Sequence, residues 1–196
     1  MGPELTHPSA LAVEVFPAAD PLRALADLPG AFVLRSSLPD TGAASRRARW
    51  TLFGADPFAS FRAGDTPVAM QTFRTAAASA PANDTARKLG VPFAGGAVGY
   101  WAYDYGRRLE RLPALARDDL GLPDCVLGLY DVTGAHDHDS GRTWLFSSGL
   151  PADTEQRSVR ARLRLQMFRE RLESPPRLAL PRAPARVPRQ AHSTFT

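Results

Sequence analysis

Two histidines, His136 and His138, each stand directly before an aspartate, and imidazole and carboxylate groups are common metal ligands. In an extended strand, residues two positions apart lie on the same face, so these imidazoles would lie side by side. The remaining histidines, His7 and His192, are close to the two ends of the sequence, and no cysteine cluster accompanies the pair. We therefore interpret the segment as the solvated end of a β-hairpin and predict no metal site in the chain.

The glycine-rich stretch 92–104 is a second candidate, because backbone amides free of side chains can cradle a phosphate group. Its glycines lack the following Lys-Ser or Lys-Thr of a P-loop and the G-x-G-x-x-G spacing of a dinucleotide-binding turn. Glycine adopts positive φ angles readily, so Gly95 and Gly96 predict a tight turn or bulge. Tyr100 and Trp101 add large contact area, and Asp104 is placed to cap a following helical turn. We interpret the stretch as a turn between packed elements.

Acidic residues pair at two places, Asp104 with Glu110 and Asp118 with Asp119. Nothing in the sequence places a base, a water or a leaving group beside either pair, so we expect local ion pairs with the intervening arginines. The sequence also lacks a Gly-x-Ser-x-Gly nucleophile elbow, and its one cysteine, Cys125, is interpreted as a buried, inert thiol. The residues alone therefore predict no active site.

The formal net charge of +4 comes mainly from arginines in the last quarter of the 196 residues. No aromatic stacking platform or nucleic-acid-binding motif accompanies them, so a solvated helix face is favoured over a nucleic-acid surface. A hydrophobic fraction of 44% is ordinary for a soluble domain. Because the sequence has neither a long apolar run nor a secretory leader, we expect a cytoplasmic protein without a membrane helix.

Apolar and alternating runs bounded by turn residues predict strands that pair as antiparallel hairpins. These extended segments are residues 12–16, 31–36, 49–53, 58–62, 67–73, 125–136 and 142–148. Asp20 before Pro21 predicts the start of a short helix. The pattern indicates an α+β fold, with antiparallel sheets and a few short helices.

One long helix is predicted over residues 153–173, with Asp153 and Gln156 forming a capping box. Its predicted apolar stripe consists of Val159, Leu163, Met167 and Leu172, with Leu165 and Phe168 nearby. Prolines recur after residue 173 and exclude a long helix or a central strand, so residues 174–190 are predicted to be a linker.

The stretch from Val91 to Pro113 resembles the N-terminal domain of aminodeoxychorismate synthase component I, and anthranilate synthase component I is similar. The structural positions of this motif are Pro92, Gly95, Gly96, Gly99, Tyr103 and Asp104. Further segments match the family in the same order, namely Val33–Ser36, Ala55–Pro57, Leu122–Asp124 and Gly128–Asp131.

This resemblance implies an antiparallel β-sheet sandwich, like the N-terminal domain of anthranilate synthase component I, over residues 1–173. It implies that residues 191–196 begin a chorismate-binding catalytic domain. In the family, that second domain holds the Mg²⁺-binding glutamates, and a glutamine amidotransferase subunit supplies ammonia. No catalytic, metal-binding or cofactor-binding residue of the family therefore falls in this chain, which we expect to be inactive alone.

The resemblance also implies one ligand site that begins in this domain, a pocket for L-tryptophan. The family's serine matches Ser36, and a second segment of the pocket matches Arg47, Ala48, Arg49 and Trp50. A serine hydroxyl can bond the ammonium or carboxylate group of an amino acid.

The leading hypothesis is thus a non-catalytic scaffold, with a tryptophan pocket, in an aminodeoxychorismate synthase component I-like protein of folate (4-aminobenzoate) biosynthesis. One alternative is the equivalent part of anthranilate synthase component I in tryptophan biosynthesis. Another is a stand-alone amino-acid-binding or interaction module.

Overall fold

A computed structural model describes residues 12–16, 20–36, 49–63, 67–78, 84–113, 118 and 120–177. The strands are β1 (Ala12–Phe16), β2 (Phe32–Arg35), β3 (Trp50–Gly54), β4 (Ala59–Arg62), β5 (Gly96–Trp101), β6 (Cys125–Tyr130), β7 (Val132–Asp137) and β8 (Arg142–Ser147). The helices are α1 (Pro21–Leu25), α2 (Pro67–Ala78), α3 (Asp84–Lys88), α4 (Arg157–Glu173) and the 3₁₀ helix η2 (Tyr103–Arg108).

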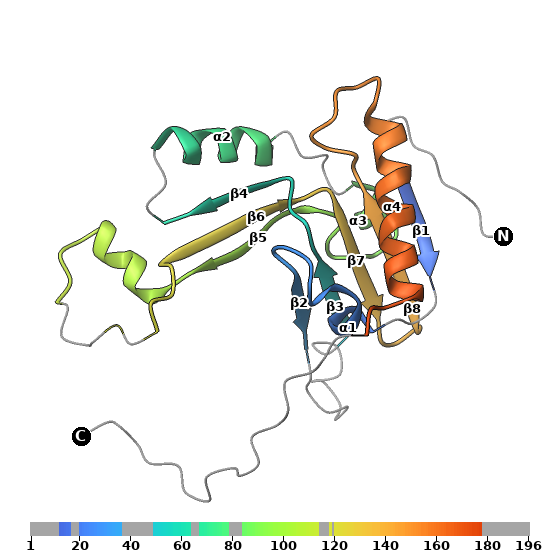
Figure 1. Cartoon of the computed structure of the whole chain (residues 1–196), viewed down its shortest axis with the longest axis horizontal. Helices are drawn as coiled ribbons and strands as arrows, with labels where there is room; N and C mark the ends of the chain where they lie inside the picture. The colour runs from blue at the N-terminus through green and yellow to red at the C-terminus, as the bar shows by residue number, and fades with distance from the viewer. Residues whose placement is uncertain are drawn as a thin grey trace, which may run out of the picture.

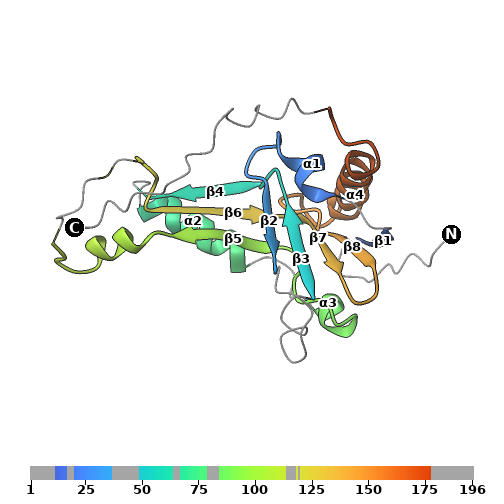
Figure 2. The same ribbon diagram turned by 90° about the horizontal axis from the view of Figure 1, so that it is seen from below.

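The strands form two antiparallel sheets (Figures 1 and 2). Sheet A has the order β1-β8-β7-β3-β2, and sheet B has the order β4-β6-β5. Helix α4 runs along one face of sheet A, whereas α2 lies over β4 and β6 of sheet B (Figure 1). The predicted α+β fold with antiparallel sheets is confirmed.

The prediction of one strand over residues 125–136 is wrong, because the chain changes sheets in the middle of this segment. It leaves sheet B at Tyr130 and enters sheet A at Val132, with the fully buried Asp131 between them. The apolar run is continuous through this point, so its hydrophobicity gives no sign of the bend. The following hairpin is confirmed, since β7 pairs with β8 around Gly141 at a φ of 67°.

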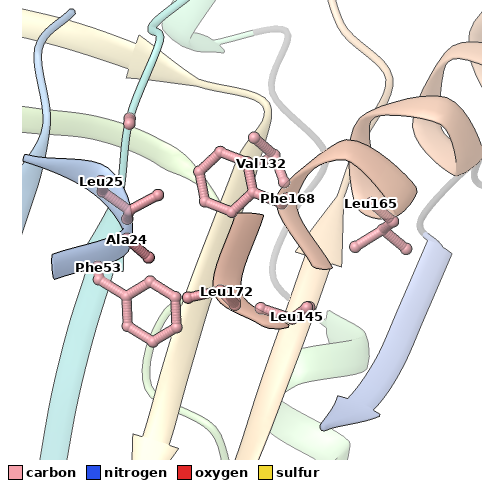
Figure 3. Close-up of a cluster of buried hydrophobic side chains, with 9 residues drawn as sticks. Ala24, Leu25, Phe53, Val132, Leu145, Leu165, Phe168 and Leu172 are labelled. Carbon is pink, nitrogen blue, oxygen red and sulfur yellow. The ribbon is translucent and has the colours of Figure 1, made fainter. Parts of the chain in front are cut away.

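The main core lies between sheet A and the helices α1 and α4 (Figure 3). Its buried members are Ala24, Leu25, Phe53, Ala55, Val132, Leu145, Leu165, Phe168 and Leu172. Asp20 caps α1 as predicted, because its Oδ1 accepts a hydrogen bond from the Arg23 amide and Pro21 opens the helix. Burial of the shared apolar surface fixes α4 against the sheet.

The long helix is present, but its buried face differs from the predicted stripe. Val159, Leu163 and Met167 are 52%, 56% and 59% exposed, and only Leu172 of the predicted set is buried. The core-facing residues are Ala161, Arg164, Leu165, Phe168 and Leu172. Two sets at helical spacing exist in this sequence, and periodicity alone cannot tell which one faces the sheet.

The start of α4 also differs from the prediction. Asp153 Oδ1 accepts a hydrogen bond from the Gln156 amide at 3.0 Å, but Gln156 itself is the N-cap and makes no side-chain capping bond. The capping box is therefore absent, and the helix begins at Arg157 instead of Asp153.

Residues 67–73 are predicted as a strand but belong to helix α2. Proline at the first helical position favours a helix, as do the alanines Ala76, Ala77 and Ala78 later in α2, whereas an apolar run between turn residues also fits a strand. Phe73 is buried against Phe61 of β4, with ring centroids 6.4 Å apart. Helix α2 thus covers one face of sheet B, and the buried Cys125 of β6 belongs to the core cluster between them.

Some expectations fall outside the described residues, including Arg47, Ala48 and the chain beyond residue 177. The predicted linker at 174–190 is therefore described only as far as residue 177. Within the described part of the chain, no helix combines the length and apolar character needed to cross a membrane.

Candidate functional site

The structure brings the two described parts of the implied tryptophan pocket to the same end of sheet A. Strand β2 pairs with β3 so that Arg35 lies opposite Thr51. Continuing this register by one residue places Ser36 at the level of Trp50, and both are partly buried. Two segments separated in the sequence thus meet at neighbouring strand ends.

Arg49 is already engaged by the protein. Its Nε and Nη2 donate to Asp137 Oδ1 and Oδ2 at 2.8 and 2.9 Å, and its guanidinium carbon lies 5.0 Å from the Trp50 ring centroid. Hydrogen bonds from Arg49 hold the pKa of Asp137 well below its usual range, and the same bonds raise the pKa of Arg49. Because Trp50 pairs with Asp137 across β3 and β7, this bidentate ion pair joins the ends of the two strands.

The two histidines lie on one face, as predicted, with ring centroids 4.7 Å apart. His136 Nδ1 lies 2.9 Å from the Thr143 hydroxyl, and His138 Nε2 lies 2.8 Å from the Thr51 hydroxyl. Burial, and next the neighbouring His138, lowers the pKa of His136. Among the described residues, no group of three or more His, Cys, Asp or Glu side chains could hold a metal ion.

We call Ser36, Arg49, Trp50 and Asp137 the strand-end cluster, whereas His136 and His138 lie on the other face of sheet A, because they alternate with Asp137 along the chain. Arg49 and Asp137 already bond to each other, so their charges are engaged within the protein.

The family-like glycines lie at the start and middle of β5. Gly95 and Gly96 have the positive φ values that glycine permits, 117° and 122°, but the interpretation of the stretch as a turn is wrong, because Gly96 begins the strand β5. A Cβ at Gly99 would lie 2.0 Å from the Val126 carbonyl oxygen, so a side chain cannot fit there without moving β6. These glycines shape sheet B.

The remaining motif residues lead into η2. The N-cap of η2 is Ala102, without a side-chain bond, so the predicted cap by Asp104 is absent. Asp104 pairs instead with Arg107 at 3.1 Å, which is an expected local ion pair, whereas Arg108 pairs at 3.5 Å with Asp124, a partner that was not predicted. Tyr103 is 92% exposed.

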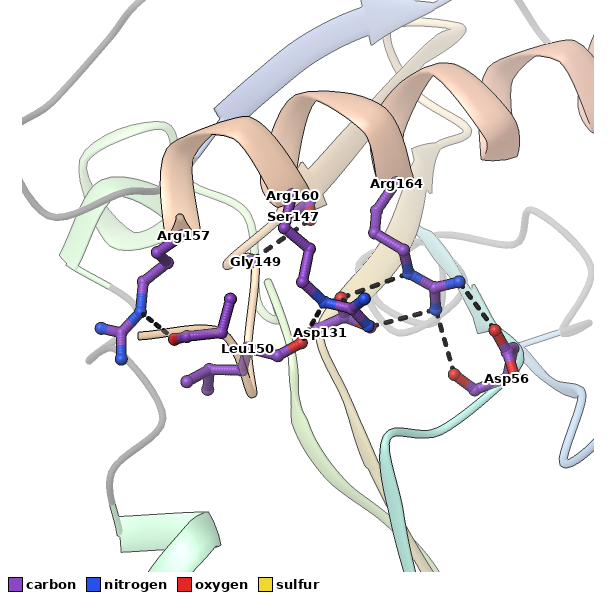
Figure 4. A network of polar contacts seen from close by, with 9 residues as sticks. Asp56, Asp131, Ser147, Gly149, Leu150, Arg157, Arg160 and Arg164 are labelled. Carbon is purple, nitrogen blue, oxygen red and sulfur yellow. Dashed lines mark hydrogen bonds and ion pairs between the residues drawn. The ribbon is translucent and has the colours of Figure 1, made fainter. Parts of the chain in front are cut away.

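Sequence reasoning missed a buried ion network centred on Arg164 (Figure 4). Its guanidinium donates to both carboxylate oxygens of Asp131, at 3.2 and 3.1 Å, and to Asp56 Oδ2 at 2.7 Å. Burial by itself lowers the pKa of Arg164, but the two carboxylates outweigh burial and leave the pKa raised. Arg160 also lies 3.6 Å from Asp131. Arg164 shares a helix face with Ala161, Leu165 and Phe168, which is the signal that could have indicated its burial.

The network fixes the place where the sheets meet. Asp131 joins β6 to β7, and Asp56 follows β3 with a φ of 54°, unusual for a residue other than glycine. The Arg164 Nη2 also donates to the Asp56 carbonyl oxygen at 3.0 Å. One arginine thus holds two connections between the sheets against α4, and the groups are structural.

Comparison with known proteins gives relatives of one kind, although no protein-family model matches the chain. Anthranilate synthase component 1 of Mycolicibacterium smegmatis is 35% identical over 140 residues, covering 64% of this chain and 26% of that protein. Aminodeoxychorismate synthase component 1 of Klebsiella aerogenes is 49% identical over 61 residues, covering 31% of this chain and 14% of that protein.

The fold comparison agrees with the sequence comparison. The crystal structure of anthranilate synthase component I from Streptococcus pneumoniae matches with a TM-score of 0.51 at 21% identity, covering 81% of this chain and 35% of that one. The chain therefore spans about a quarter to a third of the longer proteins that it matches over most of its own length. It is related in sequence and in fold to component I of the anthranilate and aminodeoxychorismate synthases, a resemblance that its glycine and aromatic motif predicted.

Proposed function

We propose that residues 1–173 are the non-catalytic N-terminal domain of an aminodeoxychorismate synthase component I-like protein that aminates chorismate for 4-aminobenzoate and folate biosynthesis. The observations that carry this proposal are the matches to anthranilate synthase component 1 over 26% of that protein and to aminodeoxychorismate synthase component 1 over 14% of that protein, at 35% and 49% identity. The described polar clusters support a scaffold role, because their ionic groups pair with one another around strand ends and sheet junctions.

In this proposal, residues 174–190 link the domain to a chorismate-binding catalytic domain, which residues 191–196 begin. Mg²⁺ would be held in that second domain, since the described residues of this chain contain no group of side chains suited to it. A glutamine amidotransferase subunit would supply ammonia to the complex, in the cytoplasm.

Enzyme assays with separated components test the scaffold role. We expect this chain, given chorismate, Mg²⁺, glutamine and an amidotransferase subunit, to form no product by itself. Addition of the chorismate-binding part of Klebsiella aerogenes aminodeoxychorismate synthase component 1 should yield 4-amino-4-deoxychorismate above the rate of that part alone. Turnover by this chain alone would contradict the non-catalytic role, and anthranilate as product would favour the anthranilate synthase alternative.

We further propose that the strand-end cluster contributes to a tryptophan pocket, with the Ser36 hydroxyl bonding the amino acid. The support is the meeting of Ser36 with Arg49 and Trp50 at neighbouring strand ends. Arg49 has a structural role in this pocket and does not bind the ligand, because its guanidinium already donates two hydrogen bonds to the Asp137 carboxylate.

Calorimetric titration with L-tryptophan tests this pocket. A hydrogen bond to a charged group contributes roughly 1.5–3 kcal/mol, so Ser36→Ala should weaken binding by about tenfold or more. Ser60→Ala, at an exposed serine on β4, is the matched control and should bind like the unmodified chain. Equal affinity of the Ser36→Ala and Ser60→Ala variants would show that tryptophan does not use this serine.

A further inference from the structure

Strand β5 lies at the edge of sheet B and pairs only with β6 among the described strands. The Ala102 amide donates to the Asp124 carbonyl at 2.7 Å, which sets the direction of the backbone groups along β5. Because these directions alternate in an antiparallel pair, the N–H and C=O groups of Ala97, Gly99 and Trp101 point away from β6. The strand thus presents a row of outward donors and acceptors.

The composition of β5 differs from that of the other edge strands in the described fold. Strands β1, β2 and β4 contain Glu14, Arg35 and Arg62, respectively. Natural proteins use such charges, or prolines, to keep edge strands from pairing with other chains. Strand β5, with the sequence Gly-Ala-Val-Gly-Tyr-Trp, contains neither.

The side chains around this edge are apolar and exposed. Helix α2 contacts β4 and β6 but leaves β5 open, and the strand extends away from the α4 side of the molecule (Figure 1). Tyr100 and Trp101 are 42% and 58% exposed, and Tyr103 follows at 92%. Further exposed apolar residues nearby in the sequence are Leu109, Leu120 and Leu122. Exposed aromatic side chains on an edge strand without charges are typical of an interaction surface.

We propose that the free edge of β5 accepts a β-strand from the chorismate-binding domain, extending sheet B, while apolar side chains of that domain cover Trp101 and Tyr103. This inference rests on the proposed function. The relatives support this occupant, because the match covers only 26% of one and 35% of another, and the rest of each polypeptide is available to cover the edge.

The test measures binding of the full 196-residue chain to the separately purified chorismate-binding part of Klebsiella aerogenes aminodeoxychorismate synthase component 1. Ala97→Pro removes an outward N–H group while keeping the bonds to β6, and it should weaken binding by about tenfold or more. Tyr103→Ala removes an exposed ring that has no place in the described core, and it should also weaken binding. Leu163→Ala, at a similarly exposed apolar residue on α4, is the matched control and should have no effect.

Hydrogen exchange of single amides gives a second readout. The amides of Ala97, Gly99 and Trp101 should exchange quickly in the free chain and become protected in the complex. If the Ala97→Pro chain fails to fold, judged by circular dichroism, Tyr103→Ala and these amides still decide the outcome.

The outcomes separate this inference from the proposed function. Absence of any binding by the unmodified chain contradicts the proposed function, and the inference falls with it. Binding that neither variant weakens, with the three amides unprotected, overturns the inference but leaves the proposed function standing. A dimer of the chain alone that Ala97→Pro disrupts would show that a second copy occupies the edge, which also overturns the inference.

Discussion

Arg164 illustrates how a single residue can determine the geometry of this domain. It is buried on the inner face of α4, and its guanidinium joins Asp131 and Asp56, which belong to the connections between the two sheets. Removing one partner of a buried pair leaves the other charge without compensation, which is strongly unfavourable. The stability of the domain should therefore depend on Arg164 more than on any surface arginine of the same helix.

We predict that Arg164→Ala lowers the free energy of unfolding by about 3–5 kcal/mol. Arg169→Ala is the matched control on α4, because Arg169 forms an exposed pair with Glu173 and should contribute less than about 1 kcal/mol. Urea denaturation followed by circular dichroism measures both changes. Similar losses in the two variants would mean that the network around Asp131 adds nothing beyond a surface ion pair.

Asp137 should make the stability depend on pH in the acidic range. Its pKa in the folded chain is lowered, chiefly by Arg49, so the unfolded chain binds a proton more readily. The resulting stabilisation is present above the unfolded value of about 4 and is lost as the pH falls below it. Asp137→Asn should lose less stability between pH 6 and pH 3 than the unmodified chain does, measured by urea midpoints. Glu155→Gln, an exposed site before α4, should keep the full pH dependence.

At the scale of elements, the orientation of α4 decides which of two apolar sets forms the core. Phe168 is 4% exposed and packs in the main core, whereas its neighbour Met167 is 59% exposed. Phe168 is buried because it lies on the same face of α4 as Leu165 and Leu172, and this face packs against sheet A. Met167 belongs to the stripe that helical spacing predicted to be buried.

Two adjacent substitutions test this orientation. Phe168→Ala should lower the free energy of unfolding by about 3–5 kcal/mol, because it leaves a cavity in the core. Met167→Ala should change it by less than about 0.5 kcal/mol, as expected for a surface position. Thermal or urea unfolding of the two variants provides the comparison. A larger loss of stability in Met167→Ala than in Phe168→Ala would mean that the stripe containing Met167 faces the core.

At the scale of the whole molecule, the two sheets are joined by a short and highly connected junction. Tyr130 ends β6 in sheet B, its hydroxyl donates to the Gly30 carbonyl at 2.7 Å, and its ring lies edge-on to Phe32 of sheet A at 4.8 Å. Asp131 follows at once and is fixed by Arg164. Because polar and aromatic contacts cross the junction together, opening one sheet disturbs the other.

We therefore predict one cooperative unfolding transition for both sheets. The tryptophans report on them separately, since Trp101 lies in β5 of sheet B and Trp50 and Trp144 lie in sheet A. Guanidinium titrations of a Trp101→Phe variant and of a Trp50→Phe, Trp144→Phe double variant should each match the circular dichroism midpoint of the same protein. Distinct midpoints for fluorescence and circular dichroism would show that the sheets unfold independently.

Local sequence features were sufficient to locate many of the strands and helices. Turn residues and apolar runs located most strands within one or two residues, and Asp20 with Pro21 marked the start of α1. The glycine and aromatic motif indicated the family, and alternation placed His136 and His138 on one face. These features follow from neighbouring residues, because turn preference, capping and strand alternation act over a few positions.

The tertiary structure decided the features that depend on distant partners. The bend at Asp131, the burial of Arg164 and the pairing of Arg49 with Asp137 join residues 33 to 108 positions apart, and no local pattern specifies such partners. The same applies to the exposed stripe of α4 and the open edge of β5, because an amphipathic pattern gives the spacing of a face but not what covers it. The sequence by itself therefore determined the elements and the family resemblance, and long-range packing decided which faces are buried and which remain available to a partner.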